Sequence, residues 1–351
     1  MDYSKVNIAF FDTKPYDRRI FEQLNENFGF NIKYFDFRLN NDTAKLVKGN
    51  QIACCFVNDD INENVINTFK ELGIKMVALR SAGYNNVDLE AAYQNVYITR
   101  VPDYSPFAVA EHAVALMLTL NRKIHKAYNR IRENNFSIDG LMGFDMHDKT
   151  IGVIGSGKIG VRLIEILKGF GTKVLVYDKY PQEEKAKEIG FSYVELDELY
   201  RKSDIISINC PLNKESKHMI NKNSIDKMKD GVMLINTSRG SIVDSKDLIE
   251  ALKNKKIGSA GLDVYEEETG FFFENYSEQV ITDDILARLQ SFPNVIITSH
   301  QGFFTKEGTY NIAKTTLENI KDFFDEKELP NEVCYKNDES KKNKEQKGRS
   351  F

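Results

Sequence analysis

The chain contains the stretch Thr150-Ile151-Gly152-Val153-Ile154-Gly155-Ser156-Gly157-Lys158-Ile159-Gly160, and this stretch decides the fold. Its first five residues predict a buried strand, and apolar residues at helical spacing after Gly160 predict a helix. We expect Gly155 to allow the tight turn, Gly157 to let backbone amides approach a pyrophosphate, and Gly160 to let the helix pack closely. The helix opens at Lys158 and Ile159, where its N-terminus offers partial positive charge to phosphates.

An acidic residue follows the next apolar run. Residues 173–177 predict a second strand, which would deliver the carboxylate of Asp178 to a ribose diol. A glycine fingerprint alone is a weak signal, but strand, helix, strand and acid occur here in register. The sequence therefore predicts a dinucleotide-binding unit that holds NAD.

Length and composition describe a globular protein of two ordinary domains. The chain has 351 residues, of which 41% are hydrophobic and 28% are charged. The formal net charge of −4 gives no reason to expect nucleic acid or an anionic membrane as a partner. The N-terminus lacks the regions of a signal peptide, and the longest helical apolar run, 113–120, is shorter than the ~20 residues that span a bilayer.

The spacing of the four cysteines is not that of a metal site. Cys54 and Cys55 are neighbours in an apolar run, where buried small hydrophobes are the simplest interpretation. We therefore expect no metal, reduced thiols and a cytoplasmic location.

Short apolar runs alternate with amphipathic stretches along nearly the whole chain. Strands are expected at 6–11, 32–37, 52–57, 76–79 and 97–99, and then at 150–154, 173–177, 205–209, 232–236, 258–263 and 295–297. Residues 106–118 predict one long helix that opens at a proline and would bridge the two groups of strands. The predicted fold class is α/β, with two doubly wound parallel-sheet domains.

Several further motifs occur in order between about Leu79 and Pro330. They are LRSAGYNNVD at 79–88, VPDYSP at 101–106, INTSRG at 235–240, GLDVYE at 261–266 and TSHQGF at 298–303. With these motifs the chain resembles the D-specific 2-hydroxyacid dehydrogenases, and within them it is similar to the fermentative D-lactate dehydrogenases. The resemblance implies an NAD-dependent enzyme with a Rossmann cofactor domain and a flavodoxin-like substrate domain.

The resemblance also implies a discontinuous substrate domain. Residues 1–102 and 300–336 would form it, and residues 103–299 would form the NAD-binding domain. Residues 337–351 are almost wholly polar and charged, which predicts a disordered tail.

Reduction of a 2-keto acid needs a hydride donor, a proton donor and a cation for the carboxylate. His300 follows the last expected strand, at the carboxyl edge where α/β sheets bind ligands, and an imidazole titrates near neutrality. Arg239 follows the strand at 232–236, and a guanidinium can bind a planar carboxylate bidentately. The resemblance implies that Glu268, within the acidic run 266–268, orients His300. We expect Arg239, Glu268 and His300 to be catalytic.

The remaining histidines are interpreted as non-catalytic. His112 lies on an apolar helix, so it would be a packing or domain-contact residue. His125, His147 and His218 lie in polar surroundings, which favours solvated side chains.

The resemblance implies further cofactor contacts. Asp263 matches the position that contacts the nicotinamide carboxamide, and Cys210 and Pro211 match a loop that borders the adenosine. Ser216 stands where relatives often carry asparagine. The nicotinamide ribose would lie beside the turn that contains Thr237, Ser238 and Arg239.

The other domain would hold the substrate. The backbone amides of Ser81, Ala82 and Gly83 would bind its carboxylate together with Arg239 and His300. Tyr104 would donate a hydrogen bond to the substrate, with a tyrosine packed at the hinge as the alternative. Phe303 would narrow the side-chain pocket towards a methyl group.

The resemblance thus implies a D-lactate dehydrogenase, which interconverts pyruvate plus NADH and D-lactate plus NAD, and a homodimer or homotetramer. The alternatives within the fold are dehydrogenases for bulkier 2-keto acids, glyoxylate or phosphoglycerate. An NAD-sensing corepressor or scaffold of the same fold is the alternative from a different class.

Overall fold

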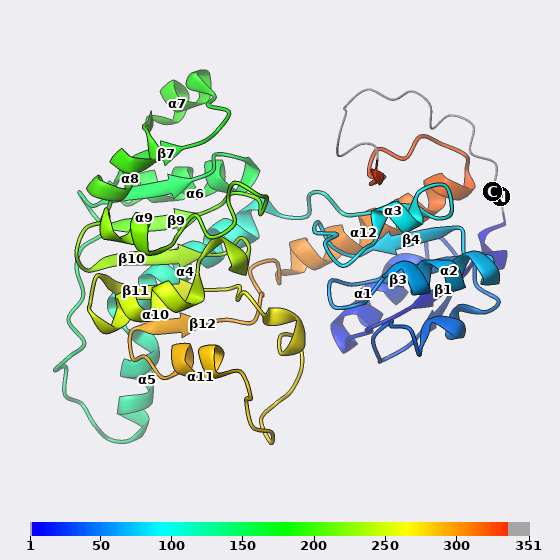
Figure 1. The fold of residues 1–351 in the computed structure, drawn as a ribbon, viewed down its shortest axis with the longest axis horizontal. Helices are drawn as coiled ribbons and strands as arrows, with labels where there is room; N and C mark the ends of the chain where they lie inside the picture. Colours follow the sequence, from blue (N-terminus) through cyan, green and yellow to red (C-terminus); the bar gives the residue numbers. More distant parts are fainter. Residues whose placement is uncertain (1, 336–351) are drawn as a thin grey trace. The chain divides into compact units, whose positions relative to one another are not determined.

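The computed structural model describes residues 2–335 and divides the chain into two compact units (Figure 1). Unit 1 comprises residues 1–105 and 305–351, and unit 2 is Pro106–Phe304. The tail expected at 337–351 lies outside the described residues. Among the described residues, no helix is both long and apolar enough to cross a membrane.

The unit boundaries differ slightly from those expected at residues 102 and 299. Residues 300–304 belong to unit 2. The sequence predicted that they begin the last segment of the substrate domain. The physical reason is that the amides of His300 and Gly302 donate to Asp263, at the end of a strand of unit 2. The helix expected to bridge the two groups of strands, α4 (Pro106–Arg122), lies wholly in unit 2.

Unit 1 contains a five-stranded parallel sheet in the order β2-β1-β3-β4-β5. This is the flavodoxin-like strand order. The strands are β1 (Asn7–Phe10), β2 (Asn31–Tyr34), β3 (Ile52–Cys55), β4 (Met76–Leu79) and β5 (Tyr97–Thr99). The helices are α1 (Pro15–Asn25), α2 (Glu63–Leu72), α3 (Leu89–Ala92) and α12 (Lys306–Phe324), with 3-10 turns at Tyr3–Lys5 and Ala44–Val47.

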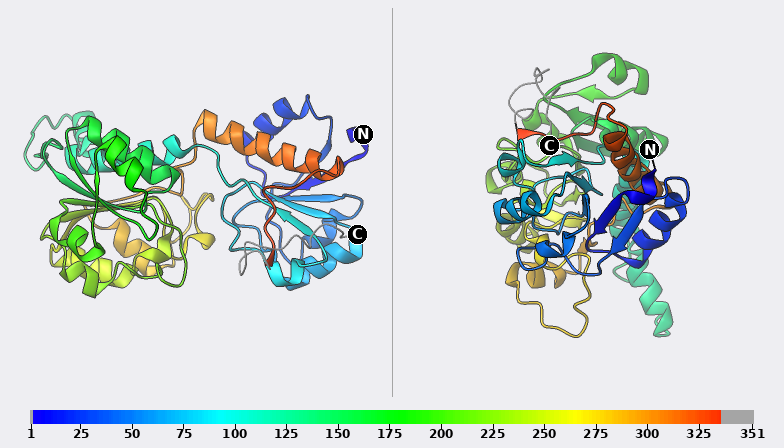
Figure 2. Two further views of the ribbon diagram at one scale, coloured as in Figure 1. Left: turned by 90° about the horizontal axis from the view of Figure 1, so that it is seen from above. Right: turned by 90° about the vertical axis from the view of Figure 1, so that its right-hand side faces the viewer.

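Alternate side chains of the central strands of unit 1 build two cores, one on each face of the sheet. Ile8 and Phe10 of β1 pack against α1 and against Leu317 of α12. Ala9 and the residue after the strand, Phe11, face the opposite way, towards α2. The C-terminal helix α12, orange in Figure 2, therefore completes the same layer as α1 although almost the whole of the chain lies between them.

Unit 2 contains a seven-stranded parallel sheet in the order β12-β11-β10-β9-β6-β7-β8. Numbered from β6, this is the Rossmann order with a seventh strand. The strands are β6 (Thr150–Ile154), β7 (Lys173–Tyr177), β8 (Ser192–Tyr193), β9 (Ile205–Ile208), β10 (Val232–Asn236), β11 (Ile257–Leu262) and β12 (Val295–Ile297). The predicted fold class is thus confirmed in both units.

Helices cover both faces of this sheet. They are α4, α5 (Ile124–Arg132), α6 (Lys158–Gly169), α7 (Glu183–Ile189), α8 (Leu196–Lys202), α9 (Lys222–Asp226), α10 (Ser245–Lys253) and α11 (Asp284–Gln290), with 3-10 turns at Gly240–Ile242 and Glu268–Gly270. Ala113 and Met117 of α4 pack with Leu163 of α6 on one core, and Leu248 and Leu252 of α10 belong to the other.

The fingerprint turn has the geometry that its glycines predict. Gly155 has a φ of +99°, and a Cβ there would lie 2.6 Å from the carbonyl oxygen of Asn209. A Cβ on Gly160 would overlap the carbonyl oxygen of Gly155. Both positions therefore require glycine, and α6 can begin directly beneath the end of β6.

The sequence pattern did not predict β8. This strand has only two residues and directly follows the charged helix α7, so it offers no alternation of apolar residues that periodicity could detect. Elsewhere the expected strands differ from the observed ones by at most three residues at an end.

Candidate active site

Polar side chains gather at the carboxyl edge of the seven-stranded sheet. Because the strands are parallel, the residues that follow them meet at the same edge. Asp178 follows β7, Cys210 follows β9, Arg239 follows β10, Asp263 follows β11 and His300 follows β12. This edge is the candidate active site of unit 2.

Asp178 is held beside the glycine-rich turn. Its Oδ2 accepts hydrogen bonds from the amide of Ser156 at 2.6 Å and from the Ser156 hydroxyl at 2.8 Å. Its Oδ1 accepts from the amide of Tyr180 at 2.8 Å. The carboxylate is therefore fixed at the end of β7, where its Oδ1 retains lone-pair capacity for a ribose hydroxyl.

The loop after β9 is closed by Ser216. Its hydroxyl donates to the carbonyl of Pro211 at 2.7 Å and accepts from the amide of Asn213 at 2.8 Å. Ser216 is buried, so its observed contacts are internal to the loop. Burial raises the pKa of the Cys210 thiol to about 11, which keeps this side chain neutral. Pro211 is exposed.

Lys179, the cation next to Asp178, is already paired. Its Nζ lies 2.7 Å from Glu215, which belongs to the loop after β9. Lys179 thus has two carboxylates beside it, Asp178, its neighbour in the chain, and Glu215, its partner. A 2′-phosphate would need positive charge at this position.

Two buried polar atoms at this edge have no hydrogen-bond partner among residues 2–335. They are Oγ1 of Thr237 and Oδ1 of Asn209. Buried polar atoms without partners are rare and indicate a missing ligand or water. A Cβ on Gly157 would meet no atom within 4 Å, so the approach to the fingerprint is open. These observations fit a dinucleotide that runs along the edge.

His300 and Glu268 form a close pair. Nδ1 of His300 lies 2.8 Å from Oε1 of Glu268, and the amide of Tyr265 donates to the other carboxylate oxygen at 3.0 Å. Both side chains are about four-fifths buried. His300 has a φ of +52°, a conformation rare outside glycine. Its Nε2 has no partner within the described chain, so this atom remains available to a substrate.

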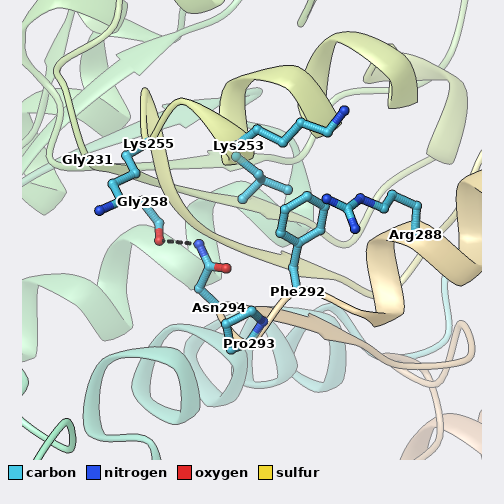
Figure 3. A pocket seen from close by; sticks show the side chains of 9 residues that line it. Gly231, Lys253, Lys255, Gly258, Arg288, Phe292, Pro293 and Asn294 are labelled. Carbon is cyan, nitrogen blue, oxygen red and sulfur yellow. Dashed lines mark hydrogen bonds between the residues drawn. The ribbon is translucent and has the colours of Figure 1, made fainter.

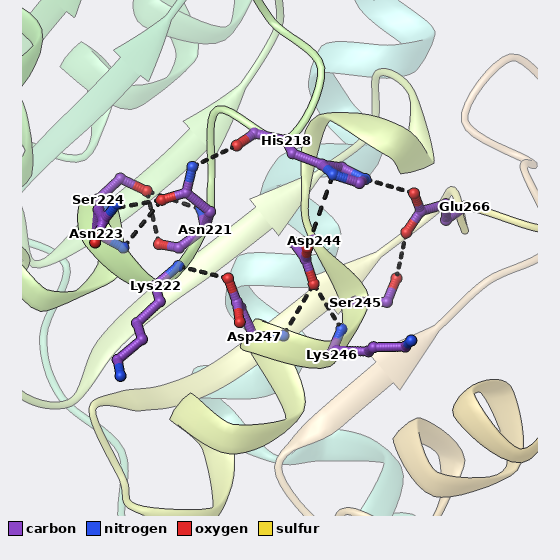
Figure 4. Close-up of polar contacts among 10 residues, drawn as sticks. All are labelled: His218, Asn221, Lys222, Asn223, Ser224, Asp244, Ser245, Lys246, Asp247 and Glu266. Carbon is purple, nitrogen blue, oxygen red and sulfur yellow. Dashed lines mark hydrogen bonds and ion pairs between the residues drawn. The ribbon is translucent and has the colours of Figure 1, made fainter.

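Two glutamates of the acidic run 266–268 contact different histidines. Glu266 contacts His218 rather than His300: its Oε1 lies 2.5 Å from Nε2 of His218 (Figure 4). Nδ1 of His218 lies 3.7 Å from Asp244. His218 is therefore paired with carboxylates, which differs from the solvated side chain that its polar sequence neighbours favoured. Its loop folds back onto the segment that holds Glu266.

Arg239 projects from a braced turn. Asn236 donates through Nδ2 to the carbonyl of Arg239 at 2.9 Å and accepts from the amide of Ser238 at 3.0 Å. Gly240 lies so close to Tyr265 that a Cβ would overlap its carbonyl group. The turn that carries Arg239 is thus packed against the segment that carries Glu268. The guanidinium is half-buried and donates to the carbonyl of Ser238 at 2.7 Å.

Asp263 lies beneath the His300 turn and is 1% exposed. Burial alone would raise its pKa, but hydrogen bonds from His112 and Thr298 outweigh this effect and lower it. The sequence predicts neither His112 nor Thr298 as a site residue. His112 reaches the site from α4, and only the packing of that helix reveals the contact.

The ring of Phe273 lies beside that of His300, and the ring of Phe303 lies beside that of Phe273. The ring centroids of Phe273 and His300 are 6.1 Å apart, and those of Phe273 and Phe303 are 6.4 Å apart. Phe303 was expected here as a wall of the side-chain pocket, whereas Phe273 was not. Phe273 has a φ of +70° within an irregular segment, and no periodic pattern would have identified it.

In unit 1 the segment Ser81–Gly83 follows β4 at the carboxyl edge of its sheet. The Ser81 hydroxyl donates to the carbonyl of Gly83 at 2.7 Å, and Arg100 donates to the carbonyl of Ala82 at 3.0 Å. The amides of these three residues donate to no acceptor within residues 2–335. The carbonyl of Tyr104, on another loop of unit 1, accepts from Asn311 of α12 at 2.7 Å.

A buried charge lies directly before this segment. Arg80 is 1% exposed, contacts Asp17 at 3.1 Å and stacks over the ring of Phe10 at 4.2 Å. Burial raises the pKa of nearby Asp59 to about 7, against the effect of hydrogen bonds from two backbone amides. The loop of free amides thus begins at a fully buried guanidinium.

A separate groove of about 690 Å³ lies at the opposite, amino edge of the sheet of unit 2 (Figure 3). Lys253, Lys255, Arg288 and Phe292 line it, and Asn294 donates across it to the carbonyl of Gly258 at 2.8 Å. None of the predicted site residues lines this groove, so it is not the candidate active site.

Known proteins resemble this chain in sequence and in fold. The family model for the D-isomer specific 2-hydroxyacid dehydrogenase, NAD binding domain, matches residues 114–302. D-lactate dehydrogenase of Escherichia coli is 50% identical over 329 residues, which is 93% of this chain and 100% of the relative. Its apo structure matches with a TM-score of 0.86 and 48% identity, covering 94% of this chain and 100% of the other.

More distant solved structures have the same fold. D-lactate dehydrogenase of Lactobacillus jensenii with NAD+ matches with a TM-score of 0.78 and 32% identity over 94% of this chain and 100% of the other. A D-2-hydroxyisocaproate dehydrogenase matches with a TM-score of 0.82 and 28% identity over 93% of this chain and 99% of the other.

Proposed function

The chain belongs to the D-isomer-specific 2-hydroxyacid dehydrogenases, which are NAD-dependent oxidoreductases, and from this premise we propose that it is a D-lactate dehydrogenase. The proposed reaction interconverts pyruvate and D-lactate. The full-length similarity to the E. coli enzyme of that name supports this substrate, since it extends over both units. Unit 2 would be the cofactor domain and unit 1 the substrate domain.

The single observation that carries the proposal is the arrangement of His300, whose Nδ1 faces Glu268 while its Nε2 has no partner among residues 2–335. Nδ1 of His300 faces Oε1 of Glu268 at 2.8 Å, so Nε2 can give a proton to the carbonyl oxygen of a keto acid. The negative charge of Glu268 stabilises the imidazolium that donates this proton and fixes the orientation of the ring. In the oxidative direction the neutral ring accepts the same proton.

Other residues would orient the substrate. Arg239 can bind its carboxylate bidentately, and the free amides of the Ser81–Gly83 segment offer further donors to the same group. Tyr104 would contribute its hydroxyl. Phe303 and Phe273 would limit the space for the substrate side chain, which favours a methyl group.

NAD would lie along the carboxyl edge of unit 2 and, when bound, supplies or accepts a hydride. Gly155, Gly157, Lys158, Ile159 and Gly160 would hold its pyrophosphate, and Asp178 its adenosine ribose. The proposed adenosine loop contains Cys210 and Pro211, and Ser216 serves to close that loop. Thr237, Ser238 and Asp263 would contact the nicotinamide half; the orphaned Thr237 hydroxyl supports this placement.

The test is an assay of NADH oxidation with a panel of 2-keto acids. We expect the highest kcat/KM with pyruvate and a product of D configuration. Arg239→Gln should reduce kcat/KM by ~10²–10³-fold, because a charged donor to the substrate is lost, while NADH still binds. Absence of turnover with every keto acid, with NADH binding intact, would identify an NAD-sensing protein of the same fold.

A specific observation supports a second candidate. The matched D-2-hydroxyisocaproate dehydrogenase is named for a bulkier substrate, and its fold is the same. Under this alternative, a branched 2-keto acid would exceed pyruvate in kcat/KM. Glyoxylate and a phosphorylated keto acid complete the panel.

We also propose that the protein is a homodimer or homotetramer, assembled through unit 2. Helix α5, at the lower left in Figure 1, buries none of its residues. Its apolar side chains Ile124, Tyr128 and Ile131 are each more than half exposed, and Met142 in the loop that follows is 88% exposed. An exposed apolar stripe of this kind indicates an interface. Sedimentation of the parent and of Ile131→Glu tests this: the variant should be smaller.

The cytoplasm is the location that we propose. Cys54, Cys55 and Cys210 have free thiols, and the first two are buried, which fits a reducing compartment. Detection of the protein in a secreted fraction would contradict this location.

A further inference from the structure

Three consecutive backbone amides converge on Asp263. The amide of His300 donates to its carbonyl oxygen at 2.7 Å. The amide of Gln301 donates to Oδ1 at 2.9 Å, and that of Gly302 to Oδ2 at 2.8 Å. Both the carbonyl and the carboxylate of Asp263 therefore bind the turn in which His300 has its unusual positive φ.

The carboxyl group accepts these bonds in its ionised form, because hydrogen bonds from His112 and Thr298 lower its pKa. It is almost completely buried, and burial by itself favours the neutral acid. Side-chain donors compensate for this cost. The Thr298 hydroxyl lies 2.5 Å from Oδ1 of Asp263, and Nε2 of His112 lies 3.2 Å from the same oxygen.

The hydrogen atoms in this cluster can be assigned by counting. Thr298 has one hydroxyl hydrogen, and the short contact with the carboxylate uses it. Nε2 of His112 lies 3.0 Å from the Thr298 oxygen, which can then only accept. Nε2 of His112 must therefore carry a hydrogen, shared between Thr298 and Asp263. The ring is fixed in the Nε2–H form unless it is fully protonated.

We propose that His112 is a positioning residue for the reaction, and this inference rests on the acid–base role proposed for His300. Its Nε2–H holds Thr298 and the carboxylate of Asp263, and that carboxylate holds the turn that aims His300 at Glu268. The chain of contacts runs from α4 through the end of β11 to the segment after β12, all within unit 2. A histidine on an otherwise apolar helix thus acts at a distance on the proton donor.

The first test measures the turn without any turnover. Amide hydrogen exchange at Gln301 and Gly302 is compared in the parent, His112→Leu, His112→Gln and the control His147→Leu. His147 is 73% exposed and lies outside the cluster. We expect exchange at least ~10-fold faster in the leucine variant, where a donor to the buried carboxylate is lost. Glutamine places an amide donor near the position of Nε2 and should restore slow exchange.

The second test separates positioning from folding. In His112→Leu we expect kcat to fall by ~10–100-fold, because a small misplacement of a reacting group has this effect. KM for the keto acid should change by less than ~3-fold, since the groups proposed to bind its carboxylate, Arg239 and the Ser81–Gly83 amides, do not include His112. His112→Gln should recover most of kcat, and His147→Leu should match the parent.

The proposal is overturned if the leucine variant exchanges Gln301 and Gly302 as slowly as the parent, or if glutamine is as impaired as leucine. In case the leucine variant does not fold, nitrogen-15 NMR of the parent imidazoles decides: a His112 ring without a hydrogen on Nε2 refutes the assignment. Failure of the proposed function is a separate result. It would appear as a parent without turnover on any 2-keto acid, whereas the exchange and NMR measurements would still report on the turn.

Discussion

Two histidines contact the first and the last glutamate of the acidic segment 266–268, and they differ in which ring nitrogen faces the carboxylate. His300 uses Nδ1 for Glu268, and its Nε2 stays available. His218 uses Nε2 for Glu266, and its Nδ1 points towards Asp244 at 3.7 Å. The two are otherwise alike, with φ values of +52° and +50° and partly buried side chains. A histidine–carboxylate pair therefore does not by itself indicate acid–base chemistry.

What distinguishes the two regions is the direction of the free nitrogen. At His300 the carboxylate lies behind the ring, and the other nitrogen can reach a ligand at the sheet edge. At His218 both nitrogens face acids, so the ring ties its loop to the segment of Glu266. The first arrangement suits proton transfer, and the second suits the anchoring of a loop.

The largest expected effect comes from matched substitutions of the two rings. Asparagine adopts positive φ readily, so His300→Asn and His218→Asn cause little backbone strain. We expect kcat to fall by ~10²–10⁴-fold at His300, where a proton donor is lost. At His218 we expect less than ~5-fold, because a part-exposed ion pair contributes about 1 kcal/mol at most. Steady-state kinetics with pyruvate decide, and similar losses in both variants would remove the distinction.

The next effect concerns the two acids. Glu268→Gln removes the negative charge that stabilises the imidazolium of His300, and we expect kcat to fall by ~10–100-fold. Pyruvate reduction should then decline at a lower pH, and lactate oxidation should begin at a lower pH. The shifts must occur together because one group serves both directions. Glu266→Gln is the matched control, and its pH profiles should overlay those of the parent.

Much of the fold could be predicted from the sequence. The central strands are short apolar runs, and two fingerprint glycines, Gly155 and Gly160, stand where close contacts with Asn209 and with the turn itself forbid a side chain. The site could be predicted only as far as strand ends reveal it. Arg239, Asp263 and His300 each follow a strand, and parallel pairing places them at one edge. Their roles remain predictions.

Side-chain partners far apart in the sequence could not be predicted in the same way. Three identical glutamates adjoin one another at 266–268, and no periodicity tells which one faces His300. The contact of His112 with Asp263 joins residues from a helix and a distant strand end, so it depends on how α4 packs. Phe273 reaches His300 only because its backbone takes a positive φ in an irregular segment.

A third effect concerns the cation Lys179, which is paired with a carboxylate as the Nε2 atom of His218 is. The question is whether this pairing prevents Lys179 from binding the 2′-phosphate of NADPH. Lys179 is paired with Glu215, and this hydrogen bond raises the pKa of Lys179. We expect the parent to prefer NADH, and Asp178→Ala to reduce the preference about tenfold, since a carboxylate repels a 2′-phosphate. Glu215→Gln should have a smaller effect in the same direction because it releases Lys179. The ratio of kcat/KM for NADH and NADPH measures both. Equal use of the two cofactors by the parent would contradict the assignment.

The smallest expected effect concerns the third histidine–carboxylate pair, His112 and Asp263, through stability at acid pH. The folded-state pKa of Asp263 is lowered, so its ionised form contributes stability above the unfolded value near 3.8, and this contribution is lost as pH falls through the folded value. His112→Leu removes one donor and should lower the free energy of unfolding by about 1 kcal/mol near neutral pH. Urea unfolding from pH 7 down to the acid limit of the folded state measures the difference. It should be constant above the unfolded pKa and shrink below it, because a protonated carboxyl no longer depends on the donor. A difference that is the same throughout the range would show that His112 stabilises the fold by packing and not through the charge of Asp263.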